Sequence, residues 1–426
     1  MGIKRTVRLF YLFYTIYTIF IMLVSDYEFS YAFWGLTILW SVYFAFSVGY
    51  HSSKWLSIQE ETIEKKEPFP FPFAQIADWK TGYYLLCGIA CWICVILAGR
   101  FYTSRGLIQV ISGLFTGERA YSIYQSYARI VNQSFSIRKV PYILMLTYST
   151  VVLFWGSAGI ILSGKKIKIS QYVFLVLVYT AYIYFGIARG TNFEVYIAFI
   201  VLVYCILNRQ FGGARRLNKQ ALIWVGILGI GVIIIFRLVV GARGITFRNN
   251  ICTEIRYDPE RFVSKYFPIV TNMMTSIFRY LGWGIYTFGA FFNDVISDSF
   301  KGFFASLLPL GYPLIFNADL PTIIRDTVDV GVGWVPDHMT FINYFGMFGY
   351  ALILFVTGRL AAQITYSHNI PNILSGLIGL IIFIEMLSIP VGNFLITSTP
   401  NTLTALIIVF WYYYERLMRR REQRTI

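Results

Sequence analysis

Apolar residues in this chain gather in long runs that are separated by short polar segments. A membrane-spanning helix takes about twenty mostly apolar residues, and ten runs approach or reach this length. They cover approximately residues 9–24, 31–50, 81–99, 141–161, 171–188, 192–207, 221–240, 340–357, 372–390 and 401–414. The pattern predicts an all-α polytopic membrane protein with ten transmembrane helices. Two further apolar stretches, 269–292 and 302–316, are either re-entrant or additional spans, which would make twelve.

Four clusters of basic residues between the runs predict how the helices are oriented. Lys and Arg favour the cytoplasmic side, and an even number of runs separates successive clusters, so all four fall on one side. The clusters are Lys4, Arg5 and Arg8; Lys165, Lys166 and Lys168; Arg209, Arg215, Arg216 and Lys219; and Arg416, Arg419, Arg420, Arg421 and Arg424. We therefore expect both termini on the cytoplasmic side.

This orientation divides the single membrane domain, residues 1–426, into membrane helices and three long connections. The charged and proline-containing segment 51–80 is expected as a cytoplasmic linker, and 100–140 and 241–338 as two large outside loops. Loops of this length without structure of their own are uncommon. Both outside loops are therefore expected to be ordered and partly helical, with amphipathic helix near 106–111 and 121–131.

Composition changes the picture in two respects. Hydrophobic residues make up 57% of the chain and charged residues only 13%, which excludes a soluble protein. The formal net charge of +15 would suggest nucleic acid in a soluble protein, but here basic cytoplasmic loops account for it. Cys87, Cys91 and Cys94 share a helical face, yet no histidine or carboxylate joins them, so no metal site is expected.

Arginines are unusually frequent on the predicted outside. That side carries 13 Arg and 3 Lys, whereas the inside carries 11 Arg and 9 Lys. Orientation signals use either residue, whereas phosphate recognition favours the two parallel hydrogen bonds of a guanidinium. The outside therefore suits a phosphate or pyrophosphate at the membrane surface. The alternative for any single arginine is pairing with loop acids or lipid headgroups. The candidate pyrophosphate ligands are Arg105, Arg119, Arg189, Arg243, Arg248 and Arg279.

Arg189 is the most informative of these arginines. It lies in a very short outside turn between two predicted spans, where an ionisable residue is costly and usually functional. The alternative is that nearby Glu194 neutralises it. Arg243 and Arg248 follow the next outward span, where Gly241 and Gly244 would let backbone N–H groups approach an anion.

Asp337 and His338 are the candidate catalytic pair. His338 is the only one of three histidines on the predicted outside, and with Asp337 it stands just before a late span. A carboxylate or histidine can serve as the general base that glycosyl transfer to a sugar hydroxyl requires; the alternative for a lone histidine is a structural hydrogen bond. Trp283, Tyr286 and Trp334 are candidates for stacking on sugar rings, or for packing at the membrane interface.

Three local patterns add a resemblance to this layout. Gly186-Ile187-Ala188-Arg189-Gly190 forms a Gly/Ala-Arg-Gly turn between mid-chain spans, Arg243-Gly244 opens the second large loop, and Ile342-Asn343-Tyr344-Phe345-Gly346-Met347-Phe348-Gly349 leads into a late span, with Gly358 further on. In these places and in its overall layout the chain resembles the Wzy-type oligosaccharide repeat-unit polymerases, which make O-antigen and capsular polysaccharide or exopolysaccharide. Asp337-His338 also resembles a feature of the related O-antigen ligases.

The resemblance implies a glycosyltransferase of the bacterial inner membrane that needs no cofactor. Its substrates would be oligosaccharides on undecaprenyl pyrophosphate, with membrane lipids, a chain-length regulator and a flippase as further partners and no nucleic acid. Arginines would replace a divalent metal, so the reaction is expected to be metal-independent. Alternatives are an O-antigen ligase, another lipid-phosphosugar glycosyltransferase, and a lipid-linked oligosaccharide flippase or transporter.

Overall fold

The computed structural model describes residues 3–57, 76–116, 136–163, 166–191, 193–208, 255–293, 336–366, 373–392 and 398–424, and a few single residues between them. These residues form helices with no β-strand among them; an isolated bridge joins Ser25 and Tyr257. The helices are α1 (Ile3–Val24), α2 (Phe29–Ser57), α3 (Thr81–Thr103), α4 (Leu107–Thr116), α6 (Val140–Ile161), α7 (Ile169–Arg189), α8 (Phe193–Asn208), α10 (Phe262–Tyr266), α11 (Pro268–Leu281), α12 (Trp283–Phe291), α16 (Asp337–Tyr366), α17 (Ile373–Ser388) and α18 (Thr399–Arg424), with 3-10 turns at Ile76–Asp78 and Ile137–Lys139. The predicted all-α class is confirmed.

Six helical segments among the described residues are long and apolar enough to cross a membrane: Ile3–Val24, Phe29–Ser52, Thr81–Thr103, Ile137–Ile161, Ile169–Arg189 and Tyr344–Thr365. The predicted runs 192–207 and 372–390 correspond to shorter apolar helices, α8 and α17, of 16 residues each. The run 401–414 lies in α18, which is not among the six. The run 221–240 and the stretch 302–316 lie outside the continuously described residues, and the count of ten to twelve spans is not confirmed.

The connecting segments contain more helix than the hydrophobic runs indicated. The predicted helix near 106–111 is confirmed as α4, whereas 121–131 lies outside the described residues apart from Tyr124. The stretch 269–292 forms two helices, α11 and α12, that are separated at Gly282 and are individually too short to span. The segment assigned to a linker begins as helix, because α2 continues to Ser57.

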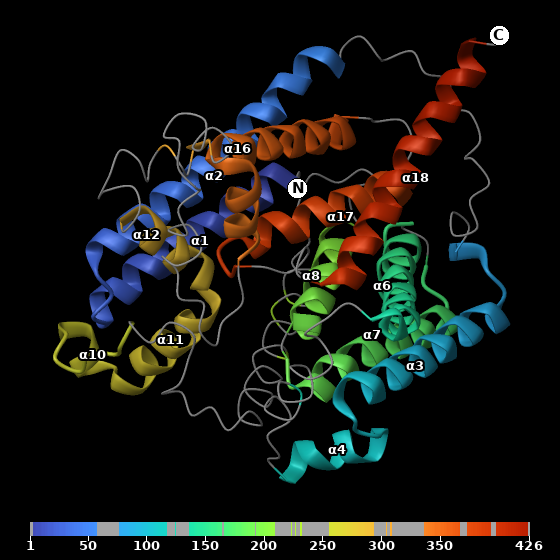
Figure 1. Ribbon diagram of the computed structural model, residues 1–426, viewed down its shortest axis with the longest axis horizontal. Helices are drawn as coiled ribbons and strands as arrows, with labels where there is room; N and C mark the ends of the chain where they lie inside the picture. Colours follow the sequence, from blue (N-terminus) through green and yellow to red (C-terminus); the bar gives the residue numbers. More distant parts are fainter. Residues whose placement is uncertain are drawn as a thin grey trace.

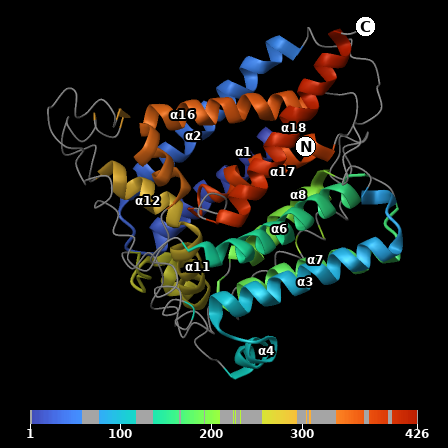
Figure 2. The ribbon, with the colours of Figure 1, turned by 45° about the vertical axis from the view of Figure 1, so that its right-hand side comes forward.

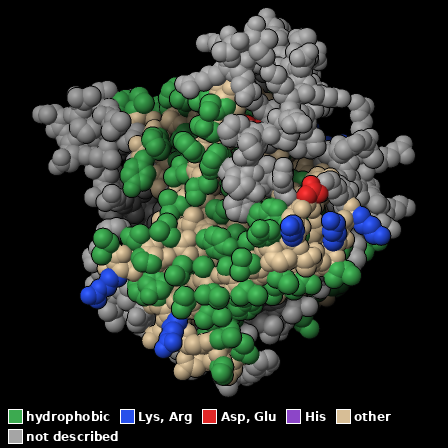
Figure 3. Space-filling model, turned by 90° about the vertical axis from the view of Figure 1, so that its right-hand side faces the viewer, with side chains coloured by type: hydrophobic (Ala, Val, Ile, Leu, Met, Phe, Trp, Pro, Cys, Tyr) green, Lys and Arg blue, Asp and Glu red, His purple; other side chains and the backbone are tan. Residues whose placement is uncertain are grey.

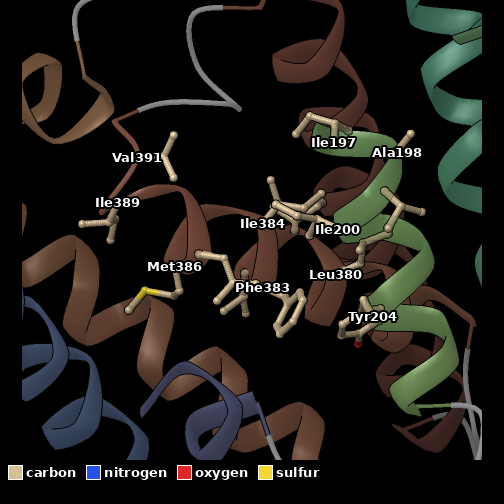
Figure 4. Packing of buried hydrophobic residues seen from close by; sticks show 14 of the residues in the cluster. Ile197, Ala198, Ile200, Tyr204, Leu380, Phe383, Ile384, Met386, Ile389 and Val391 are labelled. Carbon is tan, nitrogen blue, oxygen red and sulfur yellow. The ribbon is translucent and has the colours of Figure 1, made fainter. Parts of the chain in front are cut away.

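The helices form two groups with α17 between them (Figures 1 and 2). Helices α3, α6 and α7 contact one another on one side, and α1, α12 and α16 pack around α2 on the other. Helix α17 contacts α1 and α16 of one group and α6 of the other, as well as α8 and α18. Twelve of its 16 residues are buried. Figure 4 shows this core, in which Tyr204 of α8 packs against Phe383 with ring centroids 5.3 Å apart.

The outer surface is apolar, as a bilayer requires. Hydrophobic side chains cover much of the described surface in Figure 3, and large ones project outward from several helices, among them Ile16, Phe44 and Leu86, which are 68%, 70% and 65% exposed. In water such a surface would be costly, whereas lipid tails solvate it without penalty. The surface and the six long apolar helices together identify an integral membrane protein.

Helix α16 is bent at Gly346, within the motif that leads into the late span. This residue has φ 70° and ψ 172°, a backbone conformation that only glycine adopts readily. The bend separates a short arm, Asp337–Phe345, from the long apolar part of the helix, and both arms are visible in Figure 1. Asp337 and His338 are therefore carried by the short arm, whose direction differs from that of the span.

Candidate functional site

One turn holds the beginnings of two helices together at the candidate catalytic pair. The turn is Ser388–Gly392, which follows α17. The N–H of Gly284, in the first turn of α12, donates to the Pro390 carbonyl (3.0 Å), and the N–H of Asp337, the first residue of α16, donates to the Gly392 carbonyl (2.7 Å). Two helix N-termini that are distant in sequence are thus satisfied by one peptide segment, which brings α12 beside Asp337 and His338.

His338 is completely buried against α12. Its ring stacks on Phe288, with centroids 3.6 Å apart and planes inclined by 27°, and its Nε2 lies 3.0 Å from the Thr287 Oγ1. The Thr287 hydroxyl has a single hydrogen, which it donates to the Gly284 carbonyl. Nε2 must therefore carry a hydrogen and donate it to Thr287. In this neutral tautomer Nδ1 has the free lone pair.

The free nitrogen of His338 has the properties of a proton acceptor. Nδ1 is buried and has no hydrogen-bond partner among the described residues. Burial also holds the pKa of His338 well below its usual value, because desolvation disfavours the imidazolium. The histidine is therefore neutral at physiological pH, and it becomes a stronger base only when a neighbouring negative charge or a bound substrate stabilises its protonated form.

Two carboxyl groups, those of Asp337 and Glu385, belong to residues next to the same turn. Asp337 is 1% exposed, and its charge interacts with that of Glu385 in the last turn of α17. Tyr350 of α16 and Tyr11 of α1 interact electrostatically with Glu385 as well. The sequence interpretation did not select Glu385. The available signal was a glutamate inside an otherwise apolar predicted span, which is costly in a membrane and usually functional.

The turn and its acidic residues lie within the bundle rather than at its end. The Tyr11 hydroxyl donates to the Met386 carbonyl (2.9 Å), and Tyr11 lies eight residues after the start of α1, which is roughly 12 Å along a helix. Sequence analysis placed Asp337 and His338 in an outside loop just before a span. In the structure they are enclosed by α12, α16 and the turn after α17.

A second group of candidate residues lies where α3 and α7 end. Arg189, the last residue of α7, forms an ion pair with Glu194 of α8, which also accepts a hydrogen bond from the Thr191 hydroxyl (2.9 Å). The neutralising pair that the sequence left open is thus formed. The guanidinium also lies 4.5 Å from the ring centre of Phe185 and 5.4 Å from that of Tyr124. Its Nε has no hydrogen-bond partner among the described residues.

Arg105 lies near the same helix ends. It is 7% exposed, follows α3 in the connection to α4, and donates from Nη2 to the Gln109 carbonyl (3.1 Å). Arg189 interacts electrostatically with Tyr102 and Arg105 with Tyr184, residues of the adjacent helices α3 and α7. Two of the six candidate arginines therefore lie in one region, where Glu194 balances the charge of Arg189.

The remaining described candidates lie in α11 and α12. Arg279 is 8% exposed in α11. Trp283 is 2% exposed and stacks on Tyr286, which in turn packs against Tyr27 and Tyr31. These two aromatic residues thus contribute to interior packing, and sugar stacking on them would require the site to open. Four candidates lie outside the described residues: Arg119, Arg243, Arg248 and Trp334.

An apolar groove of about 610 Å³ runs between α1 and α2. The hydroxyl groups of Thr37 and Ser41 in it are bonded to carbonyls of their own helix, so they need no partner from an occupant. Trp40, on its wall, packs edge-to-face on Tyr11 with ring centroids 6.5 Å apart. The groove is lined by Ile19, Met22, Phe29, Phe33, Leu36, Thr37, Trp40, Ser41 and Phe44.

Within the described part of the chain, no group of three or more His, Cys, Asp or Glu side chains is placed to hold a metal ion. Comparison of the chain with protein-family models, curated proteins and solved structures gives no match.

Proposed function

We propose that the chain is a membrane-embedded glycosyltransferase that polymerises lipid-linked oligosaccharides. It transfers a growing glycan from undecaprenyl pyrophosphate to a sugar hydroxyl of an incoming lipid-linked repeat unit, at the outer face of a bacterial inner membrane. The observation that carries this proposal is the neutral, buried His338, whose Nδ1 lone pair has no hydrogen-bond partner among the described residues. Such a group accepts a proton, as activation of a sugar hydroxyl requires.

In the proposed reaction these groups act as follows. The acceptor hydroxyl loses its proton to Nδ1 of His338 while its oxygen bonds to the anomeric carbon of the donor. The bond between that carbon and the pyrophosphate oxygen breaks, and its electron pair leaves with the pyrophosphate. Asp337 stabilises the imidazolium that forms, and arginines stabilise the charge that develops on the leaving group. Arg105 and Arg189 are the described candidates for this role, provided that Arg189 exchanges Glu194 for the phosphate.

The α1–α2 groove supports a substrate with a lipid tail. Its wall contains hydrocarbon and hydroxyl groups whose hydrogen bonds are already made within α2. An apolar chain therefore fits without leaving a polar group unsatisfied. A lipid held in this groove would lie beside Trp40, which packs on Tyr11. This arrangement suits a substrate whose sugar is at the membrane surface and whose tail stays in the bilayer.

The proposal is tested with purified protein in lipid vesicles and purified undecaprenyl-pyrophosphate-linked repeat units. We expect a ladder of lipid-linked polymer, also in the presence of a chelator, and loss of the ladder in His338→Gln. His51→Gln is the matched control, because His51 is exposed on α2 and is not part of the candidate site. Formation of no polymer by the folded wild-type protein contradicts the polymerase. Transfer only to a lipid-A core would identify a ligase, and movement of units across the bilayer without transfer would identify a flippase.

A further inference from the structure

Glu385 is a half-buried acid with one buried carboxylate oxygen, and the reaction above leaves it without a role. It lies in α17, whose other residues are apolar or small, and its Oε2 atom is buried without a hydrogen-bond partner among the described residues. An ionised carboxylate in such a place costs several kcal/mol unless a cation or hydrogen-bond donors compensate it. Among the described residues, no basic side chain forms an ion pair with Glu385.

The titratable groups that face Glu385 come from two neighbouring helices. Asp337 and Tyr350 belong to α16, and Tyr11 belongs to α1. The Tyr350 side chain is 5% exposed, and its hydroxyl also lacks a hydrogen-bond partner among the described residues. The Tyr11 hydroxyl is already engaged as a donor to Met386. Two buried polar groups without partners, Glu385 Oε2 and the Tyr350 hydroxyl, therefore belong to the same region.

The other helices that pack against α17 do not compensate this acid. The apolar part of α6 carries no charged residue, and Glu194 of α8 is paired with Arg189. Glu415 of α18 lies sixteen residues after the start of that helix, toward its opposite end. Among the described residues, the charge that acts on Glu385 is that of Asp337, which has the same sign. Two carboxylates that interact inside a protein do not both ionise, because each raises the cost of the other.

We propose that Asp337 and Glu385 form a carboxyl pair that shares one proton at neutral pH, so that the region beside His338 carries a single negative charge. Glu385 holds this proton and is a positioning residue: it acts through Asp337. With one charge the pair can stabilise the imidazolium of His338 during transfer. With two negative charges the pair would be unstable, and with no charge the pair would leave the imidazolium uncompensated. This role rests on the proposed function, whereas the sharing of the proton does not.

The shared proton is detected by labelling with dicyclohexylcarbodiimide, which reacts with protonated carboxyl groups in apolar surroundings. We expect Glu385 of the folded protein to be labelled at about pH 7 and to lose reactivity as the pH rises, as followed by peptide mass spectrometry. An exposed glutamate, ordinarily ionised above a pKa of about 4.3, is not labelled under these conditions. Glu260, whose side chain is 81% exposed, and Glu194, which is buried but paired, are the internal controls.

Coupling between the two acids is tested with Asp337→Asn. Removing the neighbouring charge makes ionisation of Glu385 easier, so its labelling midpoint should move to lower pH. Absence of Glu385 labelling at about pH 7 in the wild type, or an unmoved midpoint in this variant, overturns the proposal. Activity adds a separate readout. Polymerisation by the wild type should decline at alkaline pH, where both carboxyl groups ionise. Glu385→Gln, which mimics the protonated acid, should polymerise without this decline. A protein that is labelled but makes no polymer refutes the proposed function and leaves the carboxyl pair standing.

Discussion

The imidazole of His338 has no exposed surface, and its burial makes the stability of the protein depend on pH. Its pKa is lowered in the folded state, while in the unfolded chain it returns to about the ordinary value of 6.5. Below that pH the unfolded chain therefore binds more protons than the folded protein, and the free energy of unfolding falls as the pH falls. We expect thermal unfolding in detergent to occur at lower temperature at pH 5.5 than at 7.5, with a smaller difference in His338→Gln. An unchanged pH difference in this variant, as expected for His51→Gln, would contradict the assignment.

Variants of Arg189 distinguish a structural role of this residue from a role in binding pyrophosphate. Arg189→Gln leaves the buried Glu194 carboxylate unpaired, and loss of one partner of a buried pair costs about 3–5 kcal/mol; the partial exposure of Arg189, 19% of its side chain, favours the lower end. The double variant Arg189→Gln/Glu194→Gln removes both charges and should recover most of the thermal stability. If the arginine binds pyrophosphate, the recovered protein still lacks polymerase activity. Recovery of activity together with stability would leave Arg189 with the ion pair alone.

The same residues show what the sequence could predict about the site. Arg189 was identified because its position between two apolar runs is local information, and its pairing with Glu194 spans only five residues. The burial of Asp337 and His338 was not predictable in this way, because it depends on α12 and on the turn Ser388–Gly392, both about fifty residues away. Glu385 was missed because the apolar run around it is strong enough to hide one acid.

At the scale of elements, the kink of α16 depends on Gly346. Gly346→Ala puts a Cβ on a backbone with φ 70° and ψ 172°, a conformation that costs a non-glycine residue on the order of 1–3 kcal/mol. We expect lower thermal stability and weaker polymer formation, since the arm that carries Asp337 and His338 must reorient. Gly82→Ala in α3 is the control, because a Cβ there meets no atom within 4 Å. Equal thermal stability of the two variants would show that the kink is not required.

Occupation of the groove between α1 and α2 is tested at the same scale. Thr37→Trp fills the groove, so a lipid tail that binds there should be displaced, and the KM for lipid-linked units should rise several-fold while thermal stability is retained. Thr180→Trp is a matched control: Thr180 is exposed on α7, outside the groove, and like Thr37 it donates to a carbonyl of its own helix. Equal KM values for the two variants would exclude the groove from substrate binding.

Helix boundaries show why the elements were predicted only in part. Hydropathy located the long apolar helices, since each carries enough apolar residues to be recognised alone. It did not predict that α17 would stop at Ser388, where Pro390 follows and the chain turns inside the bundle. Nor did it predict that α2 would continue to Ser57 as helix in a polar segment. These endings depend on packing between helices, which the run of hydrophobic residues does not record.

At the scale of the whole molecule, the proposed reaction requires one orientation in the membrane. It places the start of α11 and the helix α4 outside and the connection between α6 and α7 inside. Single cysteines at Ile108, Ile269 and Lys166, all exposed, report these positions in a variant whose five native cysteines are replaced. In intact cells, a membrane-impermeant maleimide should label Ile108→Cys and Ile269→Cys directly and Lys166→Cys only after permeabilisation. The reverse pattern would put Arg105, Arg189 and His338 at the cytoplasmic face, where a polymerase that uses flipped lipid-linked units cannot act.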